Sequence, residues 1–119
     1  MRISPELRQR TKHYASGIVR LFRELPARDK AVQALGLQLL RSGTSVAAHT
    51  REASRARSDA EFCSKLDGLL QKADESELWL KLLMEDYGVS SERVRFLHKG
   101  IDGVISIFTT IVAKVRRTL

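Results

Sequence analysis

Residues 58–88 read SDAEFCSKLDGLLQKADESELWLKLLMEDYG, and this stretch sets the architecture of the chain. Its apolar and small residues recur at alternating spacings of four and three, the pattern of one face of an α-helix. Ser58 and Glu61 form a capping box, and Gly88 is placed to end the helix in a left-handed conformation. We therefore expect one long helix, whose inner face consists of Phe62, Leu66, Leu69, Ala73, Ser76, Leu80, Leu83 and Tyr87.

Three further segments repeat this spacing. The first begins at Ser4-Pro5, a capping residue before a proline at the first helical position, and Pro26 ends it. Its face consists of Leu7, Thr11, Tyr14, Ile18, Leu21 and Leu25. The second segment is interrupted by Gly43, which points to close packing of another backbone or to a bend. Its face consists of Val32, Leu35, Leu39, Ser42, Val46, either His49 or Thr50, and Ala53.

The last segment opens at Ser90 or Ser91. Its face consists of Val94, Leu97, Ile101, Val104, Phe108, Ile111 and Val115. Four helices of about 20–29 residues with short connections predict an all-α, antiparallel up-down-up-down four-helix bundle. A chain of 119 residues allows a single domain spanning residues 1–119. The lone cysteine, Cys63, excludes an intrachain disulfide and a cysteine-based zinc site, and we expect it to be a packed thiol.

The net charge of +7 is unevenly distributed along the chain. Residues 1–57 carry a net charge of +8, residues 58–87 carry −5 and residues 88–119 carry +4. Two interpretations remain open. The alternation keeps facing helices attractive within the fold or across an oligomer, or the basic segments bind a polyanion such as nucleic acid.

Several classes of protein are not expected. No uninterrupted apolar run exceeds three residues, so we expect no transmembrane helix and a cytoplasmic protein. The sequence has no phosphate-binding loop, no nucleophile elbow and no Glu-x-x-His pair for a di-iron site. We therefore predict no enzyme, with no catalytic residue, metal or cofactor, and treat His13, His49 and His98 as structural or exposed.

Some apolar residues do not fit the bundle core. At about 100° per residue, they lie away from the inner faces of the third and fourth helices. We interpret them as an oligomer interface, because a contiguous exposed apolar patch usually marks an interaction surface. A wide intramolecular contact is the alternative. The candidate interface residues are Leu78, Trp79, Leu82, Phe96, Gly100, Gly103 and Ile107.

Basic residues gather on the outer faces of the first two helices. Arginine binds phosphate oxygens through paired N–H groups, so these residues are candidates for contact with a nucleic-acid backbone. Solvated or interface arginine is the alternative, since any soluble helix needs a charged outer face. The candidate nucleic-acid-binding residues are Arg8, Lys12, Arg23, Arg41, Arg51, Arg55 and Arg57.

The string RSGTSVAA at residues 41–48, with REA at 51–53 and RARS at 55–58, resembles a bacterial family. The resemblance, which extends over almost the whole chain, is to the four-helix bundle proteins encoded in intervening sequences of 23S ribosomal RNA genes. These are related to the accessory variability determinant of diversity-generating retroelements. His49 and Thr50 depart from the family pattern, in which Asn and a larger residue are commoner.

The resemblance implies an antiparallel four-helix bundle that assembles as a homopentamer, with an unassigned role and no established catalytic activity. The related protein of diversity-generating retroelements binds nucleic acid and a reverse transcriptase. We interpret the Arg41–Ser45 string as a requirement of helix packing or assembly rather than of RNA contact. Our main hypothesis is a non-enzymatic homo-oligomer that binds RNA or DNA. The alternative is a protein-interaction scaffold, or accessory subunit, without direct nucleic-acid contact.

Overall fold

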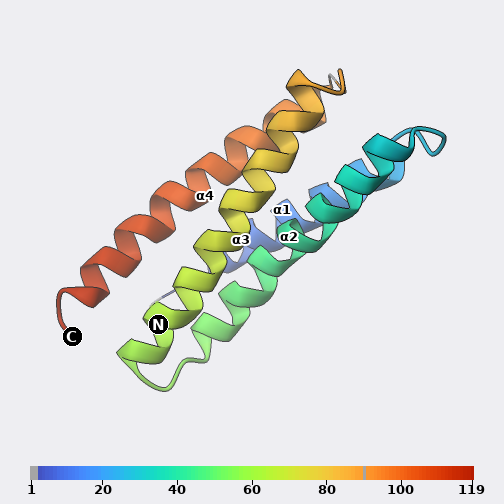
Figure 1. The fold of residues 1–119 in the computed structure, drawn as a ribbon. Helices are drawn as coiled ribbons and strands as arrows, with labels where there is room; N and C mark the ends of the chain where they lie inside the picture. Colours follow the sequence, from blue (N-terminus) through green and yellow to red (C-terminus); the bar gives the residue numbers. More distant parts are fainter. Residues whose placement is uncertain (1–2, 90) are drawn as a thin grey trace.

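Four helices form an elongated bundle of 49 × 21 × 20 Å in the computed structural model, which describes residues 3–89 and 91–119. The helices are α1 (Pro5–Glu24), α2 (Lys30–Ser54), α3 (Asp59–Glu85) and α4 (Glu92–Arg116). Successive helices run in opposite directions, and α3 lies between α2 and α4 (Figure 1). The all-α, up-down-up-down prediction agrees with this arrangement.

Each helix begins at a capping side chain that accepts hydrogen bonds from the first turn. Ser4 accepts from the N–H of Leu7, Asp29 from those of Ala31 and Val32, Ser58 from that of Glu61, and Ser91 from that of Val94. These bonds satisfy N–H groups that have no partner inside the helix. The predicted caps Ser4, Ser58 and Ser91 are confirmed, whereas the alternative Ser90 lies outside the described residues.

The end of α3 also agrees with the prediction from the sequence. Gly88 has a φ of +65°, the left-handed conformation predicted for it. The N–H of Val89 donates to the carbonyl of Leu83 at 2.8 Å, which closes the helix end. Because α3 ends at Glu85, Tyr87 lies beyond the helical repeat and is exposed, so its assignment to the inner face is wrong.

Apart from Leu7, which is half-buried at the margin, and the last positions of α4, the other predicted inner-face residues form the core, with Cys63 buried among them. Of the two candidates for the inner face of α2, Thr50 rather than His49 is buried. The hydroxyl of Thr50 donates to the carbonyl of Val46 at 2.8 Å. On α4 the buried face ends at Val112, while Ile111 and Val115 are half-buried and pack against the core from its margin. The 4-3 spacing therefore locates the core to within one residue at the end of this helix.

Helix α4 departs from one expectation of the sequence. Within the described residues it is long and apolar enough to cross a membrane, judged by length and composition alone. Its uninterrupted apolar runs are short because Gly, Ser and Thr interrupt them without making the segment strongly polar. Its most apolar window is 28% buried inside the bundle, and among the large apolar side chains of this helix Phe96 is the exposed one.

Candidate nucleic-acid interface

A groove of about 840 Å³ runs between the first half of α1 and the last third of α2. Four of its lining side chains are basic, namely Arg8, Lys12, Arg51 and Arg55. The others are uncharged: Pro5, Gln9, Ala47, Ala48 and Ser54. Within the described part of the chain, no acidic residue lines this groove, so its charge is wholly positive.

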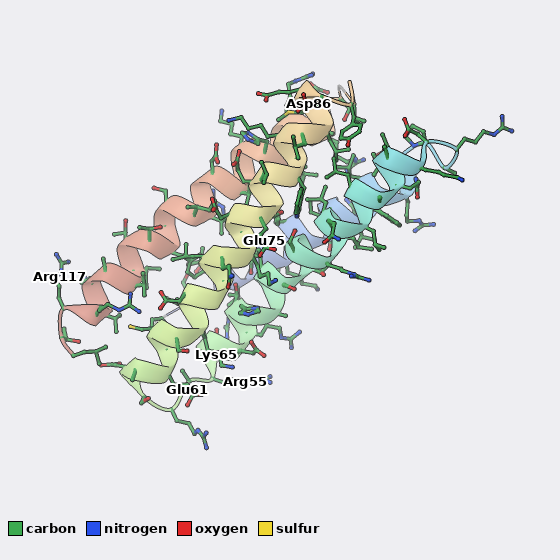
Figure 2. All side chains as sticks on the ribbon, viewed as in Figure 1. Arg55, Glu61, Lys65, Glu75, Asp86 and Arg117 are labelled. Atoms are coloured by element: carbon green, nitrogen blue, oxygen red, sulfur yellow. The ribbon has the colours of Figure 1, made fainter. Side chains whose placement is uncertain are left out.

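The local sequence explains why these side chains converge. Arg8 and Lys12 are four residues apart on α1, and Arg51 is four residues before Arg55, the residue that caps the end of α2, so each pair lies on one side of its helix. The antiparallel connection brings the start of α1 beside the end of α2, and Arg55 lies at that end, near the turn into α3 (Figure 2). The small side chains of α2 keep the space between the two pairs open.

The groove attracts negative charge by its geometry and composition. Lys12, Arg51 and Arg55 are exposed, and Arg8 is half-buried. Lysine and arginine are charged at neutral pH, and their like charges repel one another only weakly while they remain solvated. A phosphodiester backbone would bring negative charge among all four, and each arginine can donate two parallel hydrogen bonds to phosphate oxygens.

The structure brings together four of the seven predicted basic residues. Arg41 is exposed on α2, seven residues before Ala48 and therefore on the same side of the helix but outside the groove. Arg57 is exposed between α2 and α3 and lies 3.6 Å from Glu61. Arg23 is in the last turn of α1, at the other end of the bundle.

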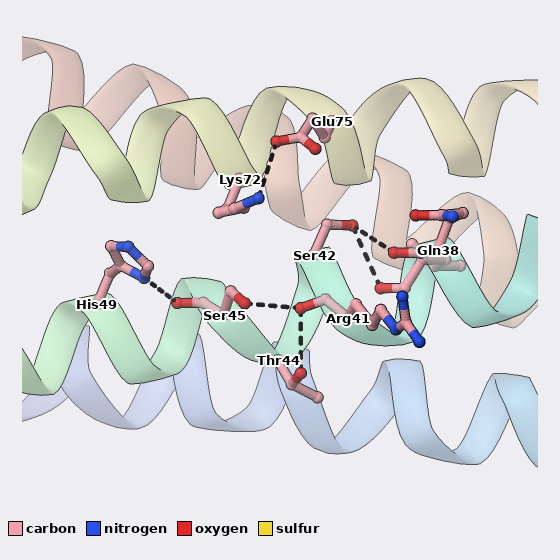
Figure 3. A network of polar contacts seen from close by, with 9 residues as sticks. Gln38, Arg41, Ser42, Thr44, Ser45, His49, Lys72 and Glu75 are labelled. Carbon is pink, nitrogen blue, oxygen red and sulfur yellow. Dashed lines mark hydrogen bonds and ion pairs between the residues drawn. The ribbon is translucent and has the colours of Figure 1, made fainter.

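The Arg41–Ser45 string has its hydroxyl groups engaged within α2 itself (Figure 3). Ser42 donates to the carbonyl of Gln38 at 3.1 Å, Thr44 to that of Leu40 at 2.7 Å, and Ser45 to that of Arg41 at 2.8 Å. Ser42 and Gly43 are buried. This arrangement supports helix packing as the role of Ser42 and Gly43, and leaves Arg41 as the exposed group of the string.

The candidate oligomer interface divides into accessible and covered residues. Phe96 is 77% exposed and Leu78 is 46% exposed, whereas Trp79 and Leu82 are half-buried and pack against the core. An added Cβ at Gly100 would meet nothing within 4 Å, but at Gly103 it would meet the guanidinium of Arg10. Ile107 is half-buried. The accessible members of the set are therefore Leu78 on α3, and Phe96 and Gly100 on α4.

Sequence reasoning missed a polar cluster between α3 and α4. The Nε2 atom of His98 lies 2.5 Å from Oε2 of Glu77, and its Nδ1 atom lies 3.9 Å from Oδ2 of Asp102. The spacing of His98 and Asp102, four residues apart, is visible in the sequence. Glu77 is 21 residues from His98, and only the pairing of α3 with α4 brings the two together.

A buried hydrogen bond lies beside this cluster. The phenol of Tyr14 and the hydroxyl of Ser76 are bonded to each other in the core. Burial raises the pKa of the Tyr14 phenol, the bond to Ser76 opposes that shift, and the carboxylates of Glu77 and Asp102 add to it.

Comparison with known proteins agrees with this architecture. The family model of the 23S rRNA-intervening sequence protein matches residues 5–110. The structure is similar to the crystal structure of a protein of unknown function from the S23 ribosomal protein family of Bacteroides thetaiotaomicron. The sequence identity is 30%, the TM-score is 0.81, and the match covers 90% of this chain and 95% of that one. No match was found among curated proteins. The chain belongs to the 23S rRNA-intervening sequence protein family, as its resemblance predicted.

Proposed function

We propose that this protein is a non-enzymatic, cytoplasmic homo-oligomer that binds nucleic acid through the groove between α1 and α2. The observation that carries the proposal is the convergence of Arg8, Lys12, Arg51 and Arg55 on one groove lined by no acidic residue of the described chain. The backbone of RNA or DNA supplies a matching row of negative charges.

Salt dependence tests the electrostatic part of the proposal. Each phosphate that a protein neutralises contributes about −0.7 to −0.9 to the slope of log K against log salt. If the four basic groups contact four phosphates, affinity for a fluorescent RNA hairpin should fall roughly 100-fold between about 50 and 200 mM salt. The same titration with duplex DNA compares the two nucleic acids. Absence of binding at low salt would refute the proposal.

A matched pair of double variants tests the groove itself. Arg51→Glu with Arg55→Glu lowers the net charge from +7 to +3, and so does Arg28→Glu with Lys30→Glu at the other end of α2. Both pairs are exposed, so both variants should fold. We expect the groove variant to lose most of the affinity and the salt dependence, and the control to lose much less. Equal losses would show that net charge, not the groove, determines binding.

Self-association is the second part of the proposal, and the family resemblance suggests five copies. Its support is the exposure of two large apolar side chains, Leu78 on α3 and Phe96 on α4, and the open space beside Gly100. Exposed apolar surface of this kind is removed from water most simply by another copy of the chain. The open surface of Gly100 would let a neighbouring helix approach closely.

A protein-interaction scaffold is the second candidate function, and the exposure of Phe96 is the observation that favours it. On that hypothesis the apolar surface binds a different protein and the basic groove contacts no nucleic acid. The two functions differ in a direct measurement. A monodisperse oligomer that binds neither RNA nor DNA at low salt would favour the scaffold.

A further inference from the structure

We propose that Glu77, His98 and Asp102 form a binding site for a divalent transition-metal ion between α3 and α4. One ligand atom from each side chain lies within 4.8 Å of the other two. The three residues contribute an imidazole nitrogen and two carboxylate oxygens, which are ordinary ligands of zinc in proteins. The site lies apart from the groove between α1 and α2, so it does not depend on the proposed binding of nucleic acid.

The bundle core fixes the backbone positions of all three ligands. Each one directly follows a buried residue: Glu77 follows Ser76, His98 follows Leu97, and Asp102 follows Ile101. Because each neighbour is held in the core, the three ligands lie on the same flank of the α3–α4 pair. The site is therefore built on rigid elements, as a binding constellation requires.

The present spacing needs only small side-chain movements to accept an ion. Bonds of about 2.0–2.2 Å to a zinc ion place neighbouring ligand atoms roughly 3–3.5 Å apart. The carboxylate of Glu77 lies 2.5 Å from Nε2 of His98 and that of Asp102 lies 3.9 Å from Nδ1, and a single ion binds only one of these two ring nitrogens. The carboxylate beside the other nitrogen must rotate toward the ion from a separation of at most 4.8 Å, and the 58% exposed side chain of Asp102 is the freer of the two carboxylates.

The ligand chemistry selects the class of ion. Magnesium and calcium prefer sites made wholly of oxygen ligands, whereas imidazole favours zinc, nickel, copper and related ions. Two carboxylates and a neutral imidazole carry a charge of −2, which a divalent cation neutralises. Glu77 and His98 are only 22% and 24% exposed, so their side of the site is partly shielded from water. Solvent would complete the coordination from the Asp102 side.

Calorimetric titration of the untagged full chain with zinc chloride tests the proposal, with magnesium chloride as the comparison. We expect saturable binding of one Zn²⁺ per chain and no comparable binding of Mg²⁺. Asp102→Ala and Glu77→Gln should each weaken zinc binding at least tenfold, because each removes a ligand. Circular dichroism establishes that each variant is folded. Asp102 is mostly exposed, so its variant tests the site even if Glu77→Gln destabilises the chain.

Two control variants distinguish this site from incidental binding elsewhere. His13→Gln removes an exposed histidine on α1 that contacts Gln9, and Asp67→Ala removes an exposed carboxylate on α3 that pairs with Arg116. Neither change should alter zinc affinity. Absence of saturable zinc binding would overturn the proposal. So would loss of binding in the His13 variant, or unchanged affinity in Asp102→Ala.

Discussion

Tyr14 on α1 and Ser76 on α3 are hydrogen-bonded to each other in the interior of the bundle, and both side chains are buried. Each hydroxyl group thereby satisfies a polar group that would otherwise be buried without a partner. The pair also links two helices that are not direct neighbours in the bundle. The bond therefore fixes the relative positions of α1 and α3 more specifically than apolar packing alone.

Removing the phenol hydroxyl should destabilise the fold. In Tyr14→Phe the hydroxyl of Ser76 stays buried and loses its partner, which costs about 1–3 kcal/mol of the free energy of unfolding. Adding Ser76→Ala removes the unsatisfied group, so the double variant should recover part of the loss. Urea unfolding of the wild type, both single variants and the double variant measures the coupling. Strictly additive losses would show that the two hydroxyls do not support each other.

Alkaline pH should weaken the fold through the same tyrosine. Burial raises the pKa of the Tyr14 phenol above its ordinary value of 10.0, so the folded chain keeps a proton that the unfolded chain loses. This contribution is fully present below about pH 10 and is lost above it, with a slope approaching about 1.4 kcal/mol per pH unit. Unfolding measured from pH 8 to 11 should therefore show a steeper decline for the wild type than for Tyr14→Phe. Parallel profiles would contradict this assignment.

The helices were predictable from the sequence because the 4-3 spacing directly reflects burial. The spacing gives a wrong prediction for Tyr87, which lies beyond the end of α3. It is also wrong by one residue at the end of α4, where Val112 rather than Ile111 is buried. Helix periodicity also identified the basic outer faces of α1 and α2. It could not select the four residues that share a groove, because that selection depends on the register between α1 and α2.

The cluster of Glu77, His98 and Asp102 escaped prediction for a related reason. The di-iron motif of helical bundles pairs each histidine with a glutamate three positions away in the same helix. Here one partner is four residues along the same helix and the other is on a neighbouring helix. Contacts between helices far apart in the sequence require the packing arrangement, which a single sequence does not specify.

Close packing of α1 on α2 should make Gly43 sensitive to substitution. A Cβ atom there would lie 2.9 Å from Cγ1 and 3.2 Å from Cγ2 of Ile18, which is fully buried. Overpacking costs about 1–3 kcal/mol, and the roughly 1 kcal/mol that alanine gains over glycine in a helix offsets part of that cost. We expect Gly43→Ala to lower the free energy of unfolding, by up to about 2 kcal/mol.

A second substitution separates this steric conflict from other causes. Ile18→Ala removes the branched side chain that the new methyl group would meet, although it creates a cavity of its own. In that background Gly43→Ala should cost much less than in the wild type, or become stabilising. Denaturant unfolding of the four proteins gives the comparison. An equal cost in both backgrounds would place the effect outside the contact between Gly43 and Ile18.

Phe96 should contribute to self-association without contributing to the fold of one chain. It is 77% exposed, so Phe96→Ser removes little packing within the chain. If Phe96 is buried between copies, its removal should cost at least about 2 kcal/mol per contact, a more than tenfold loss of affinity. Light scattering should then show a shift from a mass near 67 kDa, expected for five copies of the 13.4 kDa chain, toward smaller species.

Leu37→Ser provides the matched control for this experiment. Leu37 is 41% exposed on α2, close to the 46% of Leu78 on α3, but it lies outside the proposed interface. Leu78→Ser should therefore weaken assembly as Phe96→Ser does, while Leu37→Ser should leave the mass unchanged. A wild-type mass of 13.4 kDa at micromolar concentration would exclude self-association. Recovery of that monomer on lipid vesicles would instead assign the exposed face of α4 to a membrane, consistent with its apolar composition.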